Sequence, residues 1–476
     1  MMRKLRAGGF TAVVATIALL AAACDDGASS ADATTEVVVE ETETEDVVET
    51  VTGQTPNATV AAGACVTGEE VGISWWHNGD ADPLRSFWQE IADEFMAEHP
   101  TVHIAVRAEN NQNLRYNLLP AAFTDGSAPD IFQSWGGGEL VELVNEGKVK
   151  DLTQSNAAAI AAIGGPVASW QVAGRTYGLP YTYGPSGFWF NKNLFEEAGL
   201  STDPADLPQT LDELFDVWDT LRAHDITPVA LGGRDLWPVA HWWYWTALRS
   251  VPLSEIQNAT VNHDFSDPSW IVAGERLQEI FDEHPFNEDC EDTYWSVPGA
   301  ANEGTLSSSG LVVNGDAAME LMGVWSPGVM LGIYNDLHGQ AGTEPPNFIG
   351  WFPFPEIPDA EGDPSALLGG GDGFSLSADA PIEAACFLDY LVSSGVQTRL
   401  AQFGAIPTAP GAVNGLDYQP LVDAYRAAHN ADHVILYLDV LFGPEIASAM
   451  NSSIEHVATG DGEPEDIVTA IKDAAR

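Results

Sequence analysis

The chain has 476 residues, of which 45% are hydrophobic and 15 are tryptophans; this length and composition are typical of a folded protein of two or three domains or lobes and argue against a disordered one. Its 70 acidic residues outnumber 18 basic ones, which gives a formal net charge of −52. Nucleic acid and anionic lipid surfaces attract cationic proteins, so this charge argues against both as partners, and we interpret it as a solubility adaptation to a salty or otherwise demanding exterior.

The first part of the chain, residues 1–23, has the pattern of an export signal. A cationic start is followed by an apolar run over 10–20 that is too short to span a bilayer permanently. The stretch "LLAAAC" resembles a bacterial lipoprotein box, which implies that Cys24 is lipidated and anchors the protein to the outer face of the cell membrane. Leu20 lies one place further from Cys24 than that box usually has it, and simple cleavage after the alanines is the alternative.

Residues 24–64 are predicted to form an acidic, disordered tether. From 25 to 64 there are ten acidic residues and no Lys or Arg, so like charges repel and little apolar surface is available for burial.

The remaining cysteines suggest one disulfide. Export permits disulfide formation. Cys386 lies in the apolar helical pattern "IEAACFLDYLV" and is expected to be a buried free thiol, which leaves Cys65 and Cys290 as the favoured pair. No spacing of Cys and His indicates a metal site, and we predict no cofactor.

Strands and helices alternate after the tether. "VGISWW" (71–76), "VHIAV" (102–106) and "PDIFQSW" (129–135) read as strands, and apolar residues over 84–96 recur at helical spacing. A second region contains a capping box before a helix, the aromatic helix "WPVAHWWYWTALR" (237–249) and a strand ending in "MGVW". This alternation predicts α/β sheets with helices on both faces, in which ligands gather at the carboxyl ends of strands.

The segment "GRTYGLPYTYGPSGFWFNKNLFEEAGL" (174–200) resembles the crossover segment of bacterial extracellular solute-binding proteins of the maltose-binding type, the carbohydrate receptors of ABC importers. Four further stretches follow the family's order: "ISWWHNGD", "PDIFQSW", "NGDAAMELMGVW" and "LLGGGDGFSLS". Phe190 stands where the family usually has Tyr, which is a conservative departure. The resemblance covers nearly all of 68–476.

This resemblance implies a fold, a function and partners. The fold would be the type II periplasmic-binding-protein fold, an α/β architecture of two hinge-linked lobes, each with a central sheet flanked by helices. The lobe boundaries would be 65–182 and 346–395 for the first lobe, and 183–345 and 396–476 for the second. A mono- or oligosaccharide would bind in the cleft, and closure would create the surface recognised by the ABC permease subunits. We expect a monomer without enzymatic activity, attached to the membrane only by its lipid.

The binding residues are predicted from the chemistry of sugars. A sugar ring has apolar faces and a belt of hydroxyls, so its site needs aromatic platforms together with amide and carboxylate partners. The expected sugar-binding residues are Trp76, His77, Asn78, Asn111, Trp135, Tyr181, Tyr183, Trp242, Trp243, Trp325, Gly370, Gly371 and Asp372.

Some of these predictions are choices between neighbours. Side chains alternate along a strand, so Trp75 and Trp76 cannot face the same way, and we expect Trp76 at the cleft with Trp75 in the core. One tyrosine of the crossover and one tryptophan of the pair Trp242 and Trp243 are expected to meet the ligand.

Two other function classes stay open. A secreted glycoside hydrolase also uses aromatic platforms, and carboxylates are abundant here, but no paired-carboxylate signature is recognisable. The same fold binding a polyamine or a metal is the third class, although the many tryptophans favour a sugar.

Overall fold

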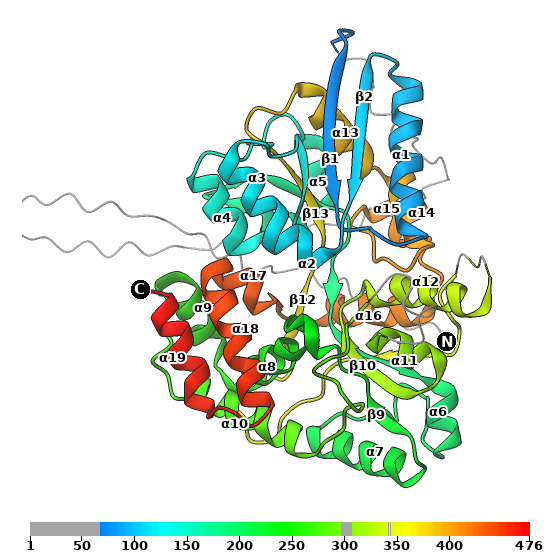
Figure 1. Cartoon of the computed structure of the whole chain (residues 1–476), viewed down its shortest axis with the longest axis vertical. Coiled ribbons are helices and arrows are strands. Elements are labelled where there is room, and N and C mark those ends of the chain that lie inside the picture. The colour runs from blue at the N-terminus through cyan, green and yellow to red at the C-terminus, as the bar shows by residue number, and fades with distance from the viewer. Residues whose placement is uncertain (1–66, 297–306, 341, 343) are drawn as a thin grey trace, which may run out of the picture.

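The computed structural model describes residues 67–296, 307–340, 342 and 344–476. The predicted export signal, tether, lipidation site Cys24 and disulfide partner Cys65 lie outside the described residues. Two α/β lobes are stacked along the long axis of the molecule and are joined near its middle (Figure 1). No helix in the described ranges is both long and apolar enough to cross a membrane.

The first lobe is built on a five-stranded sheet in the order β2-β1-β3-β13-β6. Its strands are β1 (Val71–His77), β2 (Val102–Ala108), β3 (Ile131–Ser134), β6 (Gly178–Pro180) and β13 (Gly373–Leu376). β1 runs parallel to β2 and β3, whereas β13 runs antiparallel to β3 and β6. The predicted strand–helix alternation is therefore confirmed, with one late segment completing the sheet.

Helices cover both faces of this sheet. On one face, α1 (Leu84–Glu98) and α13 (Ile382–Leu391) pack their apolar residues against Ile73 and Trp75 of β1. On the other face lie α3 (Leu119–Asp125) and α4 (Gly137–Asn145), which share a core with Phe132. The other elements of this lobe are α2 (Asn111–Asn113), the π-helix η1 (Leu114–Leu118), α5 (Ala157–Ile163), the 3-10 helix η2 (Gly165–Trp170), β4 (Gln171–Val172), β5 (Arg175–Thr176), α14 (Ser394–Ala401) and α15 (Pro410–Val413).

The second lobe has a four-stranded sheet in the order β11-β8-β10-β9. Its strands are β8 (Gly187–Asn191), β9 (Thr227–Val229), β10 (Ala317–Met322) and β11 (Ile349–Phe352). The helices are α6 (Lys192–Glu197), α7 (Leu211–Ala223), α8 (Trp237–Ser250), α9 (Leu253–Asn262), α10 (Ser269–Asp282), α11 (Ser308–Asn314), α12 (Ser326–His338), α16 (Gln419–Asn430), α17 (Leu438–Phe442), α18 (Pro444–Ala458) and α19 (Pro464–Ala474), with the 3-10 helix η3 (Gly233–Asp235).

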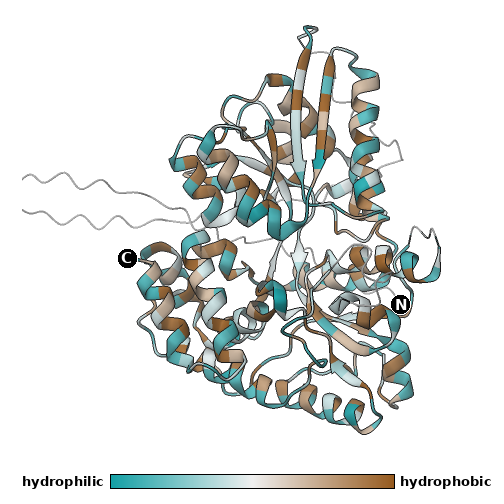
Figure 2. Cartoon of the chain, viewed as in Figure 1, coloured by the Kyte–Doolittle hydropathy of each residue, from teal (hydrophilic) through white to brown (hydrophobic). Residues whose placement is uncertain are grey.

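Local sequence determines where these helices begin and which face they bury. The predicted capping box at α7 is confirmed, because Thr210 accepts a hydrogen bond from the backbone of Glu213 while Glu213 accepts from the backbone of Thr210. Outer helices such as α18 and α19 alternate hydrophobic and hydrophilic residues, which Figure 2 shows as brown and teal stripes. By contrast, every residue of α8 is buried, so this helix forms the centre of the second lobe.

The lobes are joined by a small three-stranded sheet in the order β14-β12-β7. β7 (Gly184–Pro185) connects β6 to β8, and β12 (Leu367–Gly370) connects β11 back to β13. A third crossing runs from α15 to α16, ahead of β14 (Val434–Leu436). Three crossings therefore pass between the lobes.

Two predicted lobe boundaries need correction. β11 pairs with β8 inside the second-lobe sheet, so the return to the first lobe falls after 352 and not at 346. Val396 and Leu400 of α14 belong to the first-lobe core, so the final return begins later than 396. A β-rich stretch looks continuous in sequence, yet its strands pair with partners in different sheets, and hydrophobic periodicity does not report the partner.

The predicted pairing of Cys65 with Cys290 is wrong. Cys290 is a free cysteine, whereas Cys386, which we expected to be free, is disulfide-bonded. The physical reason lies in the start of the described chain. Thr67 donates its N–H and its hydroxyl to Glu383, at 2.9 and 2.5 Å, so this segment runs beside the first turn of α13, near Cys386.

Candidate functional site

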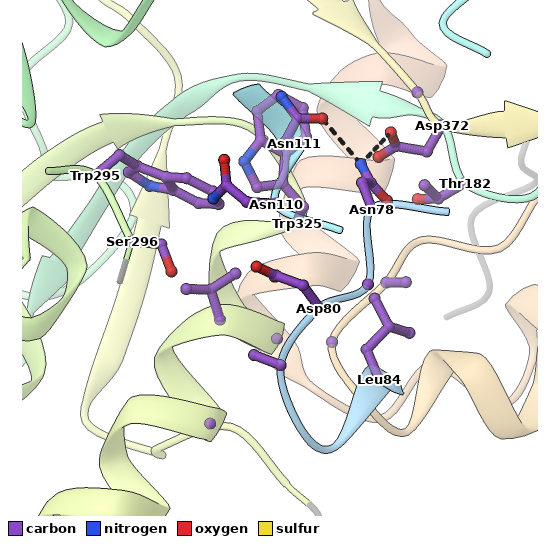
Figure 3. Close-up of a pocket in the computed structure, with 18 of the residues that line it drawn as sticks. Asn78, Asp80, Leu84, Asn110, Asn111, Thr182, Trp295, Ser296, Trp325 and Asp372 are labelled. Atoms are coloured by element: carbon purple, nitrogen blue, oxygen red, sulfur yellow. Dashed lines mark hydrogen bonds between the residues drawn. The ribbon is translucent and has the colours of Figure 1, made fainter. Parts of the chain in front are cut away.

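A cavity of about 380 Å³ lies between the two lobes. From the first lobe it is lined by the residues that follow β1, β2 and β3, including Asn78, Asn111 and Trp135. These parallel strands end at one edge of the sheet, which is the edge where the sequence predicts a ligand. The second lobe contributes residues from α8, α12 and the segment after β14. Of the second-lobe residues at the cavity, Figure 3 labels Trp295, Ser296 and Trp325.

A polar cluster forms the first-lobe side of the cavity. The Asn78 amide donates to Asn111 Oδ1 at 3.1 Å and to Asp372 Oδ1 at 3.3 Å, and both bonds are drawn in Figure 3. The Gln133 amide donates to the same Asp372 oxygen at 2.8 Å. Burial raises the pKa of Asp372 to about 6, although the Asn78 and Gln133 amides oppose that shift. The result is an ordered carboxylate whose neighbours are mainly amides.

Glycines allow this carboxylate to reach the cavity. A Cβ atom at Gly371 would overlap the backbone carbonyl oxygen of Thr182. The two crossing segments therefore touch backbone to backbone, and the Asp372 carbonyl accepts hydrogen bonds from the N–H groups of Tyr181 and Thr182 at 2.9 and 3.2 Å. Glycine at this position fixes the acid beside the crossover.

Aromatic rings form the second-lobe side. Trp237 meets Trp295 edge to face at 5.2 Å between ring centroids, and it lies 6.2 Å from Trp325. His241 stacks on Tyr437 at 4.7 Å and 7°. Trp325 meets Tyr437 at 5.6 Å. These spacings are those of mutually supporting aromatic pairs, so the rings present a rigid apolar wall to the cavity.

A buried ion-pair network joins the lobes beside this wall. Arg115 donates to Glu139 of α4 and to Asp439 of α17, each at 3.0 Å, and its side chain is only 8% exposed. Its guanidinium also lies over Trp135, 5.0 Å from the ring centroid. Glu139 belongs to the first lobe and Asp439 to the second, so one guanidinium bridges both.

Many of the predicted binding residues do line the cavity. They are Asn78, Asn111, Trp135, Tyr181, Trp325, Gly370, Gly371 and Asp372. The structure brings them together from segments that are distant in sequence. Their contact with a sugar stays a prediction.

Trp76 does not line the cavity, so its predicted placement is wrong. Trp75 is fully buried and packs against Trp88 and Phe374, as the alternation rule predicts. Trp76 faces the opposite side of the sheet, where Arg107 lies 4.5 Å from its ring centroid. Alternation separates the two faces of a sheet, whereas the cavity lies beyond the strand end, where only residues after β1 reach it.

His77 and Tyr183 are also not among the cavity-lining residues. His77 is fully buried, and its Nδ1 accepts the Gly79 N–H at 3.1 Å. Burial lowers the pKa of His77 to about 3, so the ring is neutral. Tyr183 packs against the cluster that contains Trp170, on the face of the first-lobe sheet that α3 and α4 cover.

Trp242 and Trp243 are core residues, so both are misplaced in the prediction. Trp242 packs edge-on against Phe188 at 5.6 Å, and Trp243 stacks on Trp270 at 5.8 Å. Because α8 is covered along its length, only its first turn approaches the cavity, through Trp237 and His241, which are one helical turn apart.

Several lining residues were missed or left undecided by sequence reasoning, among them Asp80, Asn110, Arg115, Trp237, His241, Trp295, Tyr437 and Asp439. Two signals were available. Trp237 precedes a proline that marks a helix start, and Trp295 is an aromatic residue in the polar stretch "NEDCEDTYW". In Figure 3 the Asp80 side chain points into the cavity, and burial raises its pKa. Within the described ranges no group of three or more His, Cys, Asp or Glu is placed to hold a metal ion.

Comparisons with known proteins agree with this architecture. The model of the family described as bacterial extracellular solute-binding protein matches residues 80–398. An ABC transporter extracellular-binding protein of Pyrococcus horikoshii is 25% identical over 260 residues, which cover 53% of this chain and only 55% of that relative. A multiple sugar-binding protein of Streptococcus mutans is 22% identical over 361 residues, 73% of this chain and 77% of the relative.

A solved structure described as a chitin oligosaccharide binding protein superposes with a TM-score of 0.72 at 21% identity. The match covers 85% of this chain and 98% of that one. At this identity the likeness establishes the fold, which is the predicted two-lobed type.

Proposed function

Because this chain belongs to the bacterial extracellular solute-binding protein family, we propose that it binds a sugar between its lobes and delivers it to the permease of an ABC importer. The observation that carries the proposal is the pairing of an aromatic wall with an amide–carboxylate cluster across one cavity. Sugar rings stack their apolar faces on indoles and direct their hydroxyls at such acceptors and donors.

The size of the cavity supports a small ligand. Its volume of about 380 Å³ lies near the lower end of the range of roughly 300–1,000 Å³ that is usual for small-molecule pockets. A mono- or short oligosaccharide fits this volume. The names of two similar proteins, the multiple sugar-binding protein of Streptococcus mutans and the chitin oligosaccharide binding protein, agree with that ligand class.

Binding would act by a population shift. A ligand that contacts the aromatic wall of one lobe and the polar cluster of the other gains both sets of contacts only when the lobes are closed. The closed state is therefore favoured by the differential binding free energy, and its surface is the one that a permease would recognise.

A thermal-shift screen followed by calorimetry tests this proposal. Purified protein is mixed with maltose, raffinose, galactose or chitobiose, and the sugar is afterwards recovered and analysed. Trp325→Ala should weaken binding by about tenfold or more, which corresponds to about 1.4 kcal/mol. Trp76→Ala is the matched control, because its ring lies outside the cavity, and it should bind as wild type.

The outcomes separate the function classes. Unaltered sugar with a raised melting temperature supports a binding protein that is not an enzyme. Cleaved sugar would indicate a glycoside hydrolase, and a response to spermidine or a metal ion alone would indicate the third class. Equal losses in both tryptophan variants would contradict the assignment of this cavity.

We also propose that Cys24 is lipidated and tethers a monomer to the outer face of the membrane. The support is the lipoprotein-like "LLAAAC" and the acidic segment behind it. Labelling with radioactive palmitate should mark the wild type and not Cys24→Ala, and size exclusion should give the monomer mass. Label on the variant, or none on the wild type, would contradict lipidation at this residue, and a larger mass would contradict the monomer.

A further inference from the structure

A buried carboxylate lies behind the aromatic wall, outside the set of cavity-lining residues. Glu320 in β10 is 1% exposed. The groups that bond to it are hydroxyls: Ser309 Oγ lies 2.9 Å from both carboxylate oxygens, Ser308 Oγ lies 3.4 Å from one of them, and Ser326 donates to the other. No cation among the described residues pairs with Glu320 in an ion pair of 4 Å or less.

The serines connect Glu320 to two tryptophans of the cavity. Ser308 and Ser309 begin α11, and the N–H of Ser309 and the hydroxyl of Ser308 both lie 3.4 Å from the Trp295 carbonyl oxygen. Ser326 directly follows Trp325 and begins α12. One carboxylate therefore bonds to the residue that follows Trp325 and to two serines of α11 that lie against the Trp295 carbonyl oxygen.

Burying an acid in this way costs folding free energy, and this cost indicates that the hydrogen bonds of the acid have a role. Burial raises the pKa of Glu320 to about 7, against the effect of the three serines. One of the three serines, Ser326, is the first residue of α12, a 13-residue helix, and a helix N-terminus favours a nearby negative charge. An apolar side chain would fill the same space without this cost.

We propose that Glu320 is a positioning residue of the sugar site: through Ser308 and Ser309 on one side and Ser326 on the other, it fixes Trp295 and Trp325 relative to each other. Figure 3 shows both tryptophans at the cavity, Trp295 from the segment before α11 and Trp325 at the start of α12. Above its pKa of about 7, for example at pH 8.5, Glu320 is ionised. Hydrogen bonds to a charged group are stronger and shorter than neutral ones, so at that pH this acid holds the two segments more firmly than an amide would.

The inference rests on the proposed function, since it concerns the same cavity, but its main test requires no ligand. The full chain is labelled with 5-fluorotryptophan, and the ¹⁹F resonances of Trp295 and Trp325 are assigned by replacing each with Phe. In Glu320→Gln both resonances should shift or broaden, while that of Trp243, in the core of the same lobe, should stay in place.

Two further variants separate positioning from general stability. Ser326→Ala should move the Trp325 resonance more than that of Trp295. Asp389→Asn is the matched control, because Asp389 is a first-lobe acid whose pKa is also raised by burial and which accepts a hydrogen bond from Asn156. This control should move neither cavity resonance, whatever it does to the melting temperature.

Binding of maltose or raffinose provides the second readout. If wild type binds either sugar, Glu320→Gln should bind it with an affinity lowered by up to about fivefold. Asp389→Asn should bind it with wild-type affinity. Unchanged resonances in Glu320→Gln would overturn the inference even where the protein folds. Shifted resonances in a protein that binds no sugar would uphold the positioning role and count against the proposed function alone.

Discussion

Replacing Asp372 with Asn should raise stability and lower sugar affinity at the same time. Asn has the same shape, and its carbonyl oxygen takes the place of the Asp372 oxygen that accepts from Asn78 and Gln133. The substitution therefore keeps these two amide hydrogen bonds and removes the charge, which the Trp135 indole also stabilises by a hydrogen bond. What changes is the cost of burying that charge and the strength of the bonds that it offers to a ligand.

The expected magnitude follows from the pKa. Burial raises the pKa of Asp372 from 3.8 to about 6, a difference of about 2 pK units (6 − 3.8). At 1.36 kcal/mol per unit, the folded protein loses up to about 3 kcal/mol by holding this group ionised. Because the folded-state pKa is raised, the folded state binds more protons than the unfolded state between about pH 4 and 6, and stability is lost as the pH rises through this window.

The assay is unfolding at pH 4 and pH 7.5 combined with calorimetry on maltose or raffinose. Asp372→Asn should raise the free energy of unfolding at pH 7.5 by as much as about 3 kcal/mol and have little effect at pH 4. It should also weaken binding by about 1 kcal/mol, or about fivefold, because a hydrogen bond to a charged acceptor is worth about 1 kcal/mol more than one to a neutral acceptor.

Asp389→Asn is again the control. Burial raises the pKa of Asp389 as well, so this variant should gain stability at pH 7.5 and keep its affinity. A less stable Asp372→Asn with unchanged affinity would refute both the charge argument and the place of this acid in the site.

Three more outcomes are expected. Gly323→Ala should weaken sugar binding, because its methyl group would overlap the ring of a cavity tryptophan and overpacking costs about 1–3 kcal/mol, whereas Gly395→Ala meets no neighbour and should bind normally in the same titration. Arg115→Met should lower the free energy of unfolding by about 3–5 kcal/mol in urea titrations, because it leaves the buried Asp439 and the half-buried Glu139 unpaired. Under non-reducing conditions, Cys386→Ser should lower the free energy of unfolding by about 2–5 kcal/mol and melt at a lower temperature, whereas Cys290→Ser should melt as wild type.

The sequence was informative wherever the relevant signal is local. Strand ends, helix caps and the "GGGDG" turn are read within a few residues, and they placed Asn78, Asn111, Trp135 and Asp372 at one cavity. The order of the family-like segments then predicted two lobes and their crossings. These features depend on chain neighbours or on chain order, which a sequence contains directly.

The failures share a cause, because they concern which partner a segment finds. The β-rich stretch before 377 contains β11 and β13, and nothing in their periodicity tells that one pairs with β8 and the other with β3. The disulfide prediction failed in the same way. Burial of Cys386 was correctly expected, but burial does not exclude a disulfide bond.

Tryptophan content alone was a poor guide to the site. Of the 15 tryptophans, those that line the cavity are Trp135, Trp237, Trp295 and Trp325. Each of them stands just after a strand, at the first turn of a helix or in a loop before one, whereas Trp75, Trp242 and Trp243 lie inside elements and are buried in the cores.

This distribution has a geometric reason. Side chains within a strand or a covered helix point sideways into the packing layers, and only the ends of elements face the space between two lobes. An indole becomes available to a ligand when it stands at the end of an element. For this reason the residue after "VGISWWH", Asn78, reaches the cavity while both indoles before it remain in the first-lobe packing.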